Sequence, residues 1–301
     1  MSAMTEDLAS LLELNISDLR FLAFDTETTG FSAGKDHVVE LAASLFDEEF
    51  EHRCFQTLVK PPIPIPAQVV AIHGIDDATV AAAPPAAAAL SLFQEYVDGA
   101  PHPRVLLAHN CAFDIGFLHE EARIAKWKGA AAPELVLDTC TLAKALLPDQ
   151  ERHSLSVVAT TLKVPMPDKL HRAAADVEVL RGVFLKLLGI AADRAVSRGG
   201  VLTLGALVDL CCGYHVLHPG APGARATGSF RLSPQLEKLN RLCGTDTAVQ
   251  IVYGDADAMA RTITPLAVRT KSFRVYVDAY CHGDNVRKTF RGDRILKVAA
   301  P

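Results

Sequence analysis

The sequence predicts an α/β protein with a mixed five-stranded sheet flanked by helices, followed by a small C-terminal β domain. Three apolar runs with short connections, at 20–25, 38–46 and 53–60, indicate a meander of antiparallel strands. Two later strand patterns, 104–110 and 134–138, alternate with segments whose apolar residues recur every three or four positions. This alternation is typical of parallel strands covered by helices.

The expected helices fill the connections of this sheet. A proline-rich stretch leads into a short helix that ends at Gly74, and the other helical patterns lie at 86–98, 113–127, 139–147, 154–163, 173–189 and 201–212. The Gly- and Pro-rich segment 213–229 indicates a linker. Ser233 as N-cap and Pro234 in the first turn then predict a helix, before short strands at 248–253, 261–268, 273–281 and 287–297.

The charge divides the chain into two parts. Residues 1–189 carry 15 basic and 26 acidic side chains, whereas residues 190–301 carry 15 basic and 9 acidic ones. This asymmetry suggests modules with different tasks. We therefore expect a domain at 15–189, a helix and linker at 190–232, and a β domain at 233–301.

The cysteines and the apolar runs indicate where in the cell the protein is expected. The seven cysteines form no CxxC pair and show no zinc spacing, and the adjacent Cys211 and Cys212 are expected in the core. The N-terminus lacks a signal-peptide pattern, and no apolar run reaches the roughly 20 residues of a membrane helix. We expect a soluble, cytoplasmic protein without membrane attachment.

Two carboxylates stand at the end of the first strand pattern. Asp25 and Glu27 are two residues apart, so both side chains leave the same face if the strand continues. Their charges repel, and a hard divalent cation such as Mg²⁺ or Mn²⁺ would relieve that repulsion. The alternative is a polar turn at a strand end.

Further acids follow later in the chain. Asp114 begins a helix after another strand end, although an aspartate is also favoured at any helix N-terminus. Asp176 lies within a helix, five residues after His171. Since five helical residues turn through about 140°, the two can converge only if His171 lies in the preceding loop. Otherwise His171 is a solvated loop residue.

Three motifs together carry a family resemblance. "DTETTG", "HNCAFD" and "HRAAAD", in this order, resemble the motifs of the DEDDh (DnaQ-like) 3′–5′ exonucleases, which include the proofreading subunit of bacterial replicative DNA polymerase. The resemblance covers roughly residues 20–188 and extends to "IHGI" (72–75), "LDT" (137–139) and "HSL" (153–155). A sister group has a tyrosine four residues before the last aspartate. That position is Arg172 here, so the histidine subtype is implied.

The resemblance implies an RNase H-like fold and a two-metal mechanism. Asp25, Glu27, Asp114 and Asp176 would hold two divalent cations, Mg²⁺ or Mn²⁺, about 4 Å apart. His171 would act as general base on the attacking water, and the product would be a nucleoside 5′-monophosphate.

Other family positions concern the substrate. The resemblance places Thr28, Thr29, Gly30 and Phe31 at the seat of the terminal nucleotide, and His73 and Asn110 along the substrate path. Alternatively, His73 lies near a helix end capped by Gly74, and Asn110 is a turn residue. Asp138 is interpreted as a structural cap of the helix that follows it.

The C-terminal region resembles a second family. The segments "IVYG", "RTITP", "VYVDAYC" and "RKTFRGDRI" resemble the strands of WYL domains over about the last 65 residues, although only Tyr276 remains of the namesake Trp-Tyr-Leu. This implies a small SH3/Sm-like β-barrel that senses nucleic acid or a nucleotide-like ligand. The candidate phosphate-binding face comprises Arg261, Arg274, Arg287, Arg291 and Arg294. The alternative is a solvated charged face, with Arg294 paired to Asp293 or Asp278.

The leading hypothesis is a metal-dependent 3′–5′ exonuclease that acts on single-stranded 3′ ends, of DNA rather than RNA, in proofreading or repair. A polymerase or repair complex is a possible partner. One alternative is an exoribonuclease of the same fold, because the motifs do not encode how the pocket treats the 2′-OH. Another is a non-catalytic nucleic-acid-binding regulator. The presence of all five catalytic positions argues against the latter.

Overall fold

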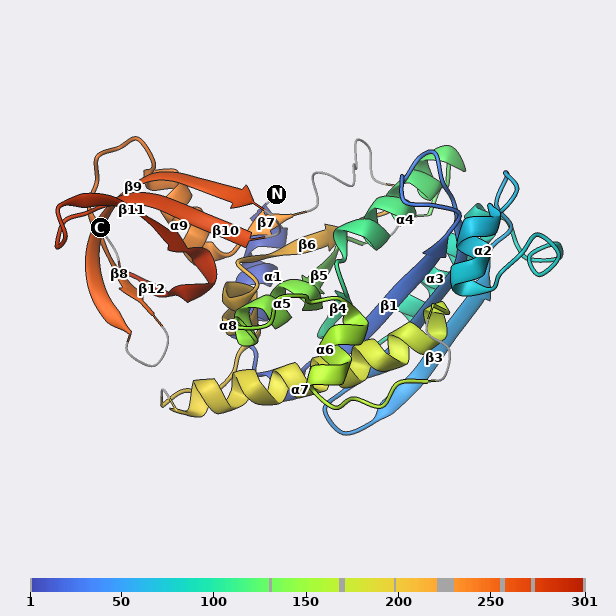
Figure 1. The fold of residues 1–301 in the computed structure, drawn as a ribbon, viewed down its shortest axis with the longest axis horizontal. Coiled ribbons are helices and arrows are strands. Elements are labelled where there is room, and N and C mark those ends of the chain that lie inside the picture. The colour runs from blue at the N-terminus through green and yellow to red at the C-terminus, as the bar shows by residue number, and fades with distance from the viewer. Residues whose placement is uncertain are drawn as a thin grey trace.

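The chain folds into a larger α/β part and a smaller β part that lie side by side (Figure 1). This computed structural model describes residues 2–129, 132–167, 171–197, 199–220, 230–254, 258–271 and 274–299. Among these residues, no helix combines the length and the apolar character that a membrane span requires.

The larger part is built on a seven-stranded mixed sheet in the order β3-β2-β1-β4-β5-β6-β7. The predicted antiparallel meander is confirmed, and so is the parallel arrangement of the later strands, since β4 pairs parallel with β1 and β5 pairs parallel with β4. The strands are β1 (Arg20–Thr28), β2 (Val38–Phe46), β3 (Glu51–Leu58), β4 (Arg104–Ala108), β5 (Glu134–Asp138), β6 (Gly213–Leu217) and β7 (Arg231–Leu232).

Two strands extend the sheet beyond the five that the sequence predicts. β6 pairs antiparallel with β5, and β7 pairs with β6. The linker prediction for 213–229 is therefore wrong for Gly213–Leu217, while residues 221–229 lie outside the described part. The Gly and Pro content downstream masked a short strand whose partner, β5, is distant in sequence.

The helices follow the predicted order and lie at α1 (Ser2–Glu13), α2 (Ala67–His73), α3 (Ala86–Asp98), α4 (Ala112–Ile124), α5 (Thr139–Leu146), α6 (Leu155–Thr161), α7 (Ala173–Ser197), α8 (Leu204–Leu210) and α9 (Pro234–Leu242). Gly74 caps α2 with φ of 72°, as predicted. Helix α1 was not predicted, and α7 continues past the expected end at 189.

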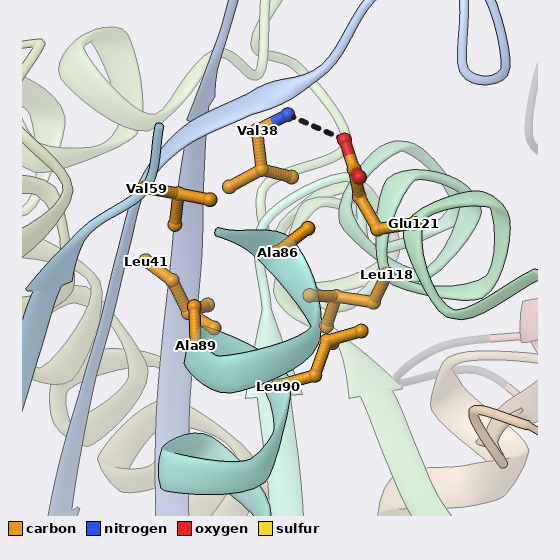
Figure 2. A pocket seen from close by; sticks show the side chains of 8 residues that line it. All are labelled: Val38, Leu41, Val59, Ala86, Ala89, Leu90, Leu118 and Glu121. Atoms are coloured by element: carbon orange, nitrogen blue, oxygen red, sulfur yellow. Dashed lines mark hydrogen bonds between the residues drawn. The ribbon is translucent and has the colours of Figure 1, made fainter. Parts of the chain in front are cut away.

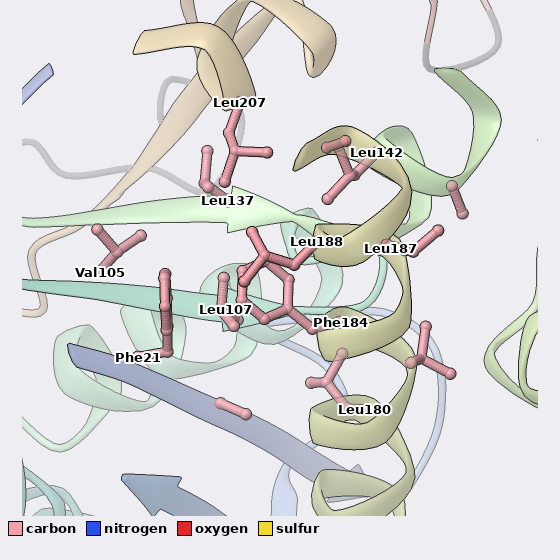
Figure 3. Packing of buried hydrophobic residues seen from close by; sticks show 14 of the residues in the cluster. Phe21, Val105, Leu107, Leu137, Leu142, Leu180, Phe184, Leu187, Leu188 and Leu207 are labelled. Atoms are coloured by element: carbon pink, nitrogen blue, oxygen red, sulfur yellow. The ribbon is translucent and has the colours of Figure 1, made fainter. Parts of the chain in front are cut away.

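Strand β1 alternates between two apolar layers. Phe21 and Ala23 contribute to the layer that includes α5, α6 and α7, whereas Leu22 and Phe24 contribute to the layer under α3 and α4. The rings of Phe21 and Phe184 lie 4.8 Å apart at the centre of the α7 layer (Figure 3). Side chains at odd-numbered positions of β1 therefore face α7.

A small apolar pocket lies between β2, α3 and α4 (Figure 2). Its volume is about 10 Å³, room for roughly one water molecule. At its rim, Glu121 accepts hydrogen bonds from the backbone of Val38 and from Nδ1 of His37, each at 3.0 Å. This pocket cannot hold a nucleotide. The hydrogen bonds of Glu121 fix the start of β2, next to the end of β1.

The smaller part is a five-stranded antiparallel sheet in the order β11-β10-β9-β8-β12. Helix α9 packs on it through Leu236 and Leu239, and Ser233 caps that helix as predicted. The predicted strand 287–297 is interrupted by a short 3-10 helix, Gly292–Arg294. The strands are β8 (Val249–Tyr253), β9 (Met259–Lys271), β10 (Arg274–Cys281), β11 (Val286–Arg291) and β12 (Ile295–Val298).

The adjacent cysteines mark the junction of the two parts. Cys211 belongs to the α7-side core of the larger part, and Cys212 belongs to the core of the smaller one. Both are buried, which confirms their predicted place in the core. The sulfur of Cys212 faces Gly292, where a Cβ would approach it to 3.0 Å.

Candidate active site

Strand β1 delivers two acids to the α7 side of the sheet. Asp25 and Glu27 continue the face of Phe21 and Ala23, but lie beyond the apolar layer, and both are half-buried. Glu27 lies directly opposite Glu40 in the β1–β2 register, and a bulge follows Glu27. The sheet thus places three carboxylates at one edge, where the period of two in β1 predicted two of them.

Helix α4 brings a third predicted acid to this edge. Asp114 lies in the first turn of α4, just after the end of β4, and only 3% of it is exposed. Its Oδ1 accepts hydrogen bonds from the backbone N–H and the hydroxyl of Thr26, at 3.0 and 2.7 Å. Because Thr26 stands between Asp25 and Glu27, these bonds hold Asp114 against the β1 acids.

Helix α7 and the loop before it complete the cluster. Asp176 lies in the first turn of α7, and His171 lies two residues before the helix with a φ of 66°. One carboxylate oxygen each of Glu27 and Asp176 and one ring nitrogen of His171 lie within 4.8 Å of one another. The convergence of a loop histidine and a helical aspartate is as predicted.

The electrostatics of the cluster are those of crowded acids. Burial raises the pKa of Asp25 well above its ordinary value, and the charges of Asp114, Asp176 and Glu27 raise it further. Burial and the neighbouring carboxylates raise the pKa of Glu27 to about 8. Burial also raises the pKa of Asp176, and it raises that of Asp114 to about 7 despite the hydrogen bonds from Thr26. Such a set fits divalent cations, which stabilise the ionised carboxylates.

Comparison with known proteins agrees with this geometry. The sequence profile of the Exonuclease family (RNase_T) matches residues 22–184, more than half of the chain. The chain belongs to this family. A WYL domain profile matches residues 234–300, which confirms the second resemblance. Members of the exonuclease family generally use divalent metal ions, for which the carboxylates described above are suitable ligands.

Two individual relatives have names that refer to DNA polymerase III subunit epsilon. The chain is 35% identical over 204 residues to a "DNA polymerase III subunit epsilon-like protein" of Rhodobacter capsulatus, covering 66% of this chain and 27% of that protein. It is 32% identical to "DNA polymerase III subunit epsilon" of Treponema pallidum, covering 56% and 76% respectively. The chain thus matches only about a quarter of the Rhodobacter protein.

A solved structure confirms the predicted RNase H-like fold. Cell-death related nuclease 4 (CRN-4) superposes with a TM-score of 0.51 at 13% sequence identity, covering 59% of this chain and 66% of that one.

The loop after β1 borders the candidate site. The hydroxyl of Thr28 donates to the carbonyl of Gly30 at 2.6 Å, and Thr29 exchanges hydrogen bonds with the backbone of His37. A Cβ at Gly30 would lie 2.5 Å from the carboxyl group of Asp36, so a side chain here would displace that carboxylate, which accepts a hydrogen bond from the backbone N–H of Ser32. Phe31 is 80% exposed at this edge.

His73 is buried rather than lining an open path. Its Nδ1 accepts from the backbone N–H of Ile75 at 3.0 Å, at the end of α2. Burial lowers the pKa of His73, and the nearby backbone of Thr28 acts in the opposite direction without outweighing it. Its geometry supports the helix-end alternative, and a role toward substrate stays a prediction.

Asn110 occupies a left-handed turn between β4 and α4, with φ of 67°. Its backbone N–H donates to Oδ1 of Asp138 at 2.9 Å, and the same oxygen accepts from the backbone of Cys140. The structural interpretation of Asp138 is confirmed, since it caps α5 and also fixes the turn that precedes Asp114.

A contact between Glu40 and Arg172 was not predicted from the sequence. Glu40 is fully buried, and its carboxylate binds the guanidinium of Arg172 and the backbone N–H of Ala173. Burial acts to raise the pKa of Glu40, but the hydrogen bonds from Arg172, Gln56 and Ala173 outweigh it and lower that pKa. The available signal was a single glutamate in the apolar run "VVELAASLF", which a buried strand tolerates only with a partner.

The C-terminal arginines of the candidate phosphate-binding face differ in their surroundings. Arg261 pairs with Asp284, and Arg291 pairs with Asp293. Arg287 is exposed on β11, Arg294 takes part in other contacts, and the side chain of Arg274 lies outside the described part. Phosphate binding by these residues stays a prediction.

Proposed function

We propose that the chain is a metal-dependent 3′–5′ exonuclease that releases nucleoside 5′-monophosphates. The observation that carries this proposal is the convergence of Glu27, His171 and Asp176 within 4.8 Å, beside Asp25 and Asp114. Acids from three distant segments meet at one sheet edge together with a histidine, a side chain that commonly serves as a general base. That combination suits hydrolysis of a phosphodiester better than simple binding.

The carboxylates, the histidine and Thr26 have separate roles in this proposal. When bound by the four carboxylates, two Mg²⁺ or Mn²⁺ ions would neutralise charge at the scissile phosphate and lower the pKa of the attacking water. His171 accepts the proton of that water at a ring nitrogen, and its exposed loop position lets it pass the proton to solvent. The hydrogen bonds from Thr26 fix one oxygen of Asp114 and so orient the other.

The loop after β1 would receive the terminal nucleotide. The backbone of Thr28, Thr29 and Gly30 is held rigid by the hydrogen bonds described above, and Phe31 presents an exposed ring at the same edge. Stacking of a base on an aromatic ring is tolerant of sequence. This fits an enzyme that removes any nucleotide from an end.

DNA is the substrate that the similarities favour, since one relative described above is named as DNA polymerase III subunit epsilon and the other as an epsilon-like protein. A polymerase or repair complex is the corresponding candidate partner. We infer in addition that the basic C-terminal domain binds nucleic acid and raises its effective concentration at the acidic exonuclease domain.

A panel of end-labelled substrates tests the proposal. Single-stranded DNA and RNA of one sequence, labelled at either end, are incubated with the full chain and Mg²⁺ or Mn²⁺. We expect mononucleotide from the 3′ label first, faster from DNA. Failure to release mononucleotide from any substrate would remove the proposal, and release from the 5′ label first would reverse the direction.

Two substitutions assign the residues. Asp25→Ala removes a carboxylate ligand, so we expect activity to be lost at every metal concentration while the fold is kept. His171→Ala removes the base, so we expect turnover to fall by roughly 10²–10⁴-fold with metal binding retained. Unchanged turnover in His171→Ala would exclude the role as base.

A further inference from the structure

A second group of metal-binding side chains lies apart from the catalytic acids. One ligand atom each of Cys111, Asp138 and His215 lies within 4.8 Å of the other two. Cys111 and Asp138 are buried, with exposed fractions of 0% and 6%. The three come from the start of α4, the end of β5 and the middle of β6, so the fold and not a local motif assembles them.

The sheet explains why these side chains meet. His215 pairs with Val136 across β5 and β6, and Asp138 lies two residues after Val136 on the same face. This is the face that packs under α4, because Val136 and Cys111 belong to the same core cluster. Cys111 immediately precedes α4 and projects into this layer, and the ring of Phe230 packs against His215 with centroids 5.1 Å apart.

One oxygen of Asp138 is already fixed. Oδ1 accepts from the backbone N–H groups of Asn110 and Cys140, each at 2.9 Å. Metal-binding carboxylates are commonly held in this way by outer hydrogen bonds, which set their orientation. The thiol of Cys211 lies on the other side, where it contacts the backbone carbonyl of Asp138 at 3.9 Å.

The donor set points to a particular class of metal. A thiolate, an imidazole and a carboxylate together suit Zn²⁺, whereas Mg²⁺ favours oxygen ligands alone. Zinc bonds of about 2.0–2.3 Å hold tetrahedral ligand atoms roughly 3.4–3.6 Å apart. The three ligand atoms lie within 4.8 Å of one another, a limit wider than this spacing, so the side chains have to rotate toward the ion on binding.

We propose that Cys111, Asp138 and His215 bind one zinc ion, at a three-ligand site separate from the proposed catalytic carboxylates. On binding, the thiol of Cys111 loses its proton to solvent and a zinc–sulfur bond forms, with no change of oxidation state. The ion joins the turn that precedes Asp114 to β6, the strand that leads toward the C-terminal domain. The proposal does not depend on nuclease activity.

Zinc retention tests this site in the full chain. The Asp176→Ala variant serves as background, because it removes a member of the catalytic cluster. After chelation, dialysis, addition of ZnCl₂ and desalting, zinc per chain is measured by elemental analysis. We expect about one zinc per chain in the background and a zinc content at least about tenfold lower after adding Cys111→Ser or His215→Ala.

Cys54→Ala is the matched control, since Cys54 is an exposed thiol on β3, and it is expected to retain zinc. Cobalt provides a second readout, because a thiolate–cobalt charge-transfer band reports the metal–sulfur bond itself. The band should appear in the background and in Cys54→Ala, and disappear in Cys111→Ser with an unchanged circular dichroism spectrum. Equal zinc retention in all variants, or no band in the background, would overturn the proposal.

Discussion

Arg172 binds Glu40 through two guanidinium nitrogens, at 2.7 and 3.0 Å, next to the acids of the candidate active site. The Glu40 side chain is fully buried, whereas that of Arg172 is 41% exposed. The same carboxylate accepts the backbone N–H of Ala173 at 2.9 Å, at the start of α7. Since Glu40 is also the cross-strand neighbour of Glu27, this ion pair ties the His171 loop to the sheet edge that carries the acids.

We predict that Arg172→Met lowers both stability and turnover. Glu40 keeps its other hydrogen bonds but loses its cation, and a buried charge without a partner is costly. Because Arg172 is partly exposed, we expect a loss of about 1–3 kcal/mol in the free energy of unfolding, measured with urea. Turnover should fall more than KM changes, because His171 adjoins Arg172 and loses its fixed position.

Arg181→Met is the matched control. Arg181 lies on the same helix and approaches Glu51 only at 3.6 Å, in a partly exposed pair. Arg172→Lys keeps the charge but not the two-nitrogen geometry, so it should restore part of the lost turnover. Equal losses of turnover in Arg172→Met and Arg181→Met would contradict a positioning role for the Glu40 pair.

The pH dependence of stability follows from the crowded acids. The pKa of Glu27 is about 8 in the folded, metal-free chain, against an ordinary value of 4.5. Between these values the unfolded chain has already released the proton that the folded chain retains, so stability falls as pH rises. We predict that the metal-free protein is less stable at pH 8.5 than at pH 5.5, and that Mg²⁺ restores stability at the higher pH.

Glu27→Gln isolates this contribution. In the presence of a chelator at pH 8.5, we expect the substitution to raise the free energy of unfolding by about 1–2 kcal/mol, since it removes the charge that burial disfavours. Well below pH 4.5, where Glu27 is largely protonated in both states, the variant and the original chain should unfold at similar urea concentrations. A variant that is destabilised at pH 8.5 would show that Glu27 is not held in a repulsive environment.

Most of the candidate site was predictable from the sequence, because the local structure of each motif determines where its side chains lie. Asp25 and Glu27 share a face through the strand period, and His171 had to lie in a loop to reach Asp176. The Glu40–Arg172 pair was not predictable in the same way, because its partners are 132 positions apart and no periodicity links them. Strand β6 was not predicted from the sequence, for a related reason. Its five residues are ordered by pairing with β5, and its own composition gave no strong strand signal.

Phe31 offers a test of the nucleotide seat. It is 80% exposed at the loop after β1, so Phe31→Ala should leave the free energy of unfolding within about 0.5 kcal/mol of the original. If the ring stacks on the terminal base, KM should rise by roughly tenfold or more, since such stacking contributes about 1–3 kcal/mol. Steady-state kinetics on short single-stranded DNA measure this.

Phe50 is the control for Phe31. It is 64% exposed in the turn between β2 and β3, outside both strands. Phe50→Ala should not alter KM, and Phe31→Tyr should preserve it because the ring remains. If Phe31→Ala and Phe31→Tyr raise KM equally, stacking is not the role of this side chain.

The C-terminal domain contributes one exposed arginine that can be tested alone. Arg287 lies opposite Tyr280 in the β10–β11 register, and Arg291 lies opposite Tyr276 on the same face. Arg291 is already paired with Asp293, which leaves Arg287 as the better candidate for a phosphate contact. We predict that Arg287→Ala weakens binding of the full chain to long single-stranded DNA and reduces the slope of log affinity against log salt by about 0.7.

Arg241→Ala is the control, because Arg241 is exposed on α9 and pairs with Glu237. Fluorescence anisotropy across a salt series in Ca²⁺, with the Asp25→Ala variant as common background to prevent cleavage, gives both slopes. The same slope for Arg287→Ala and the background would show that this face does not contact the phosphates.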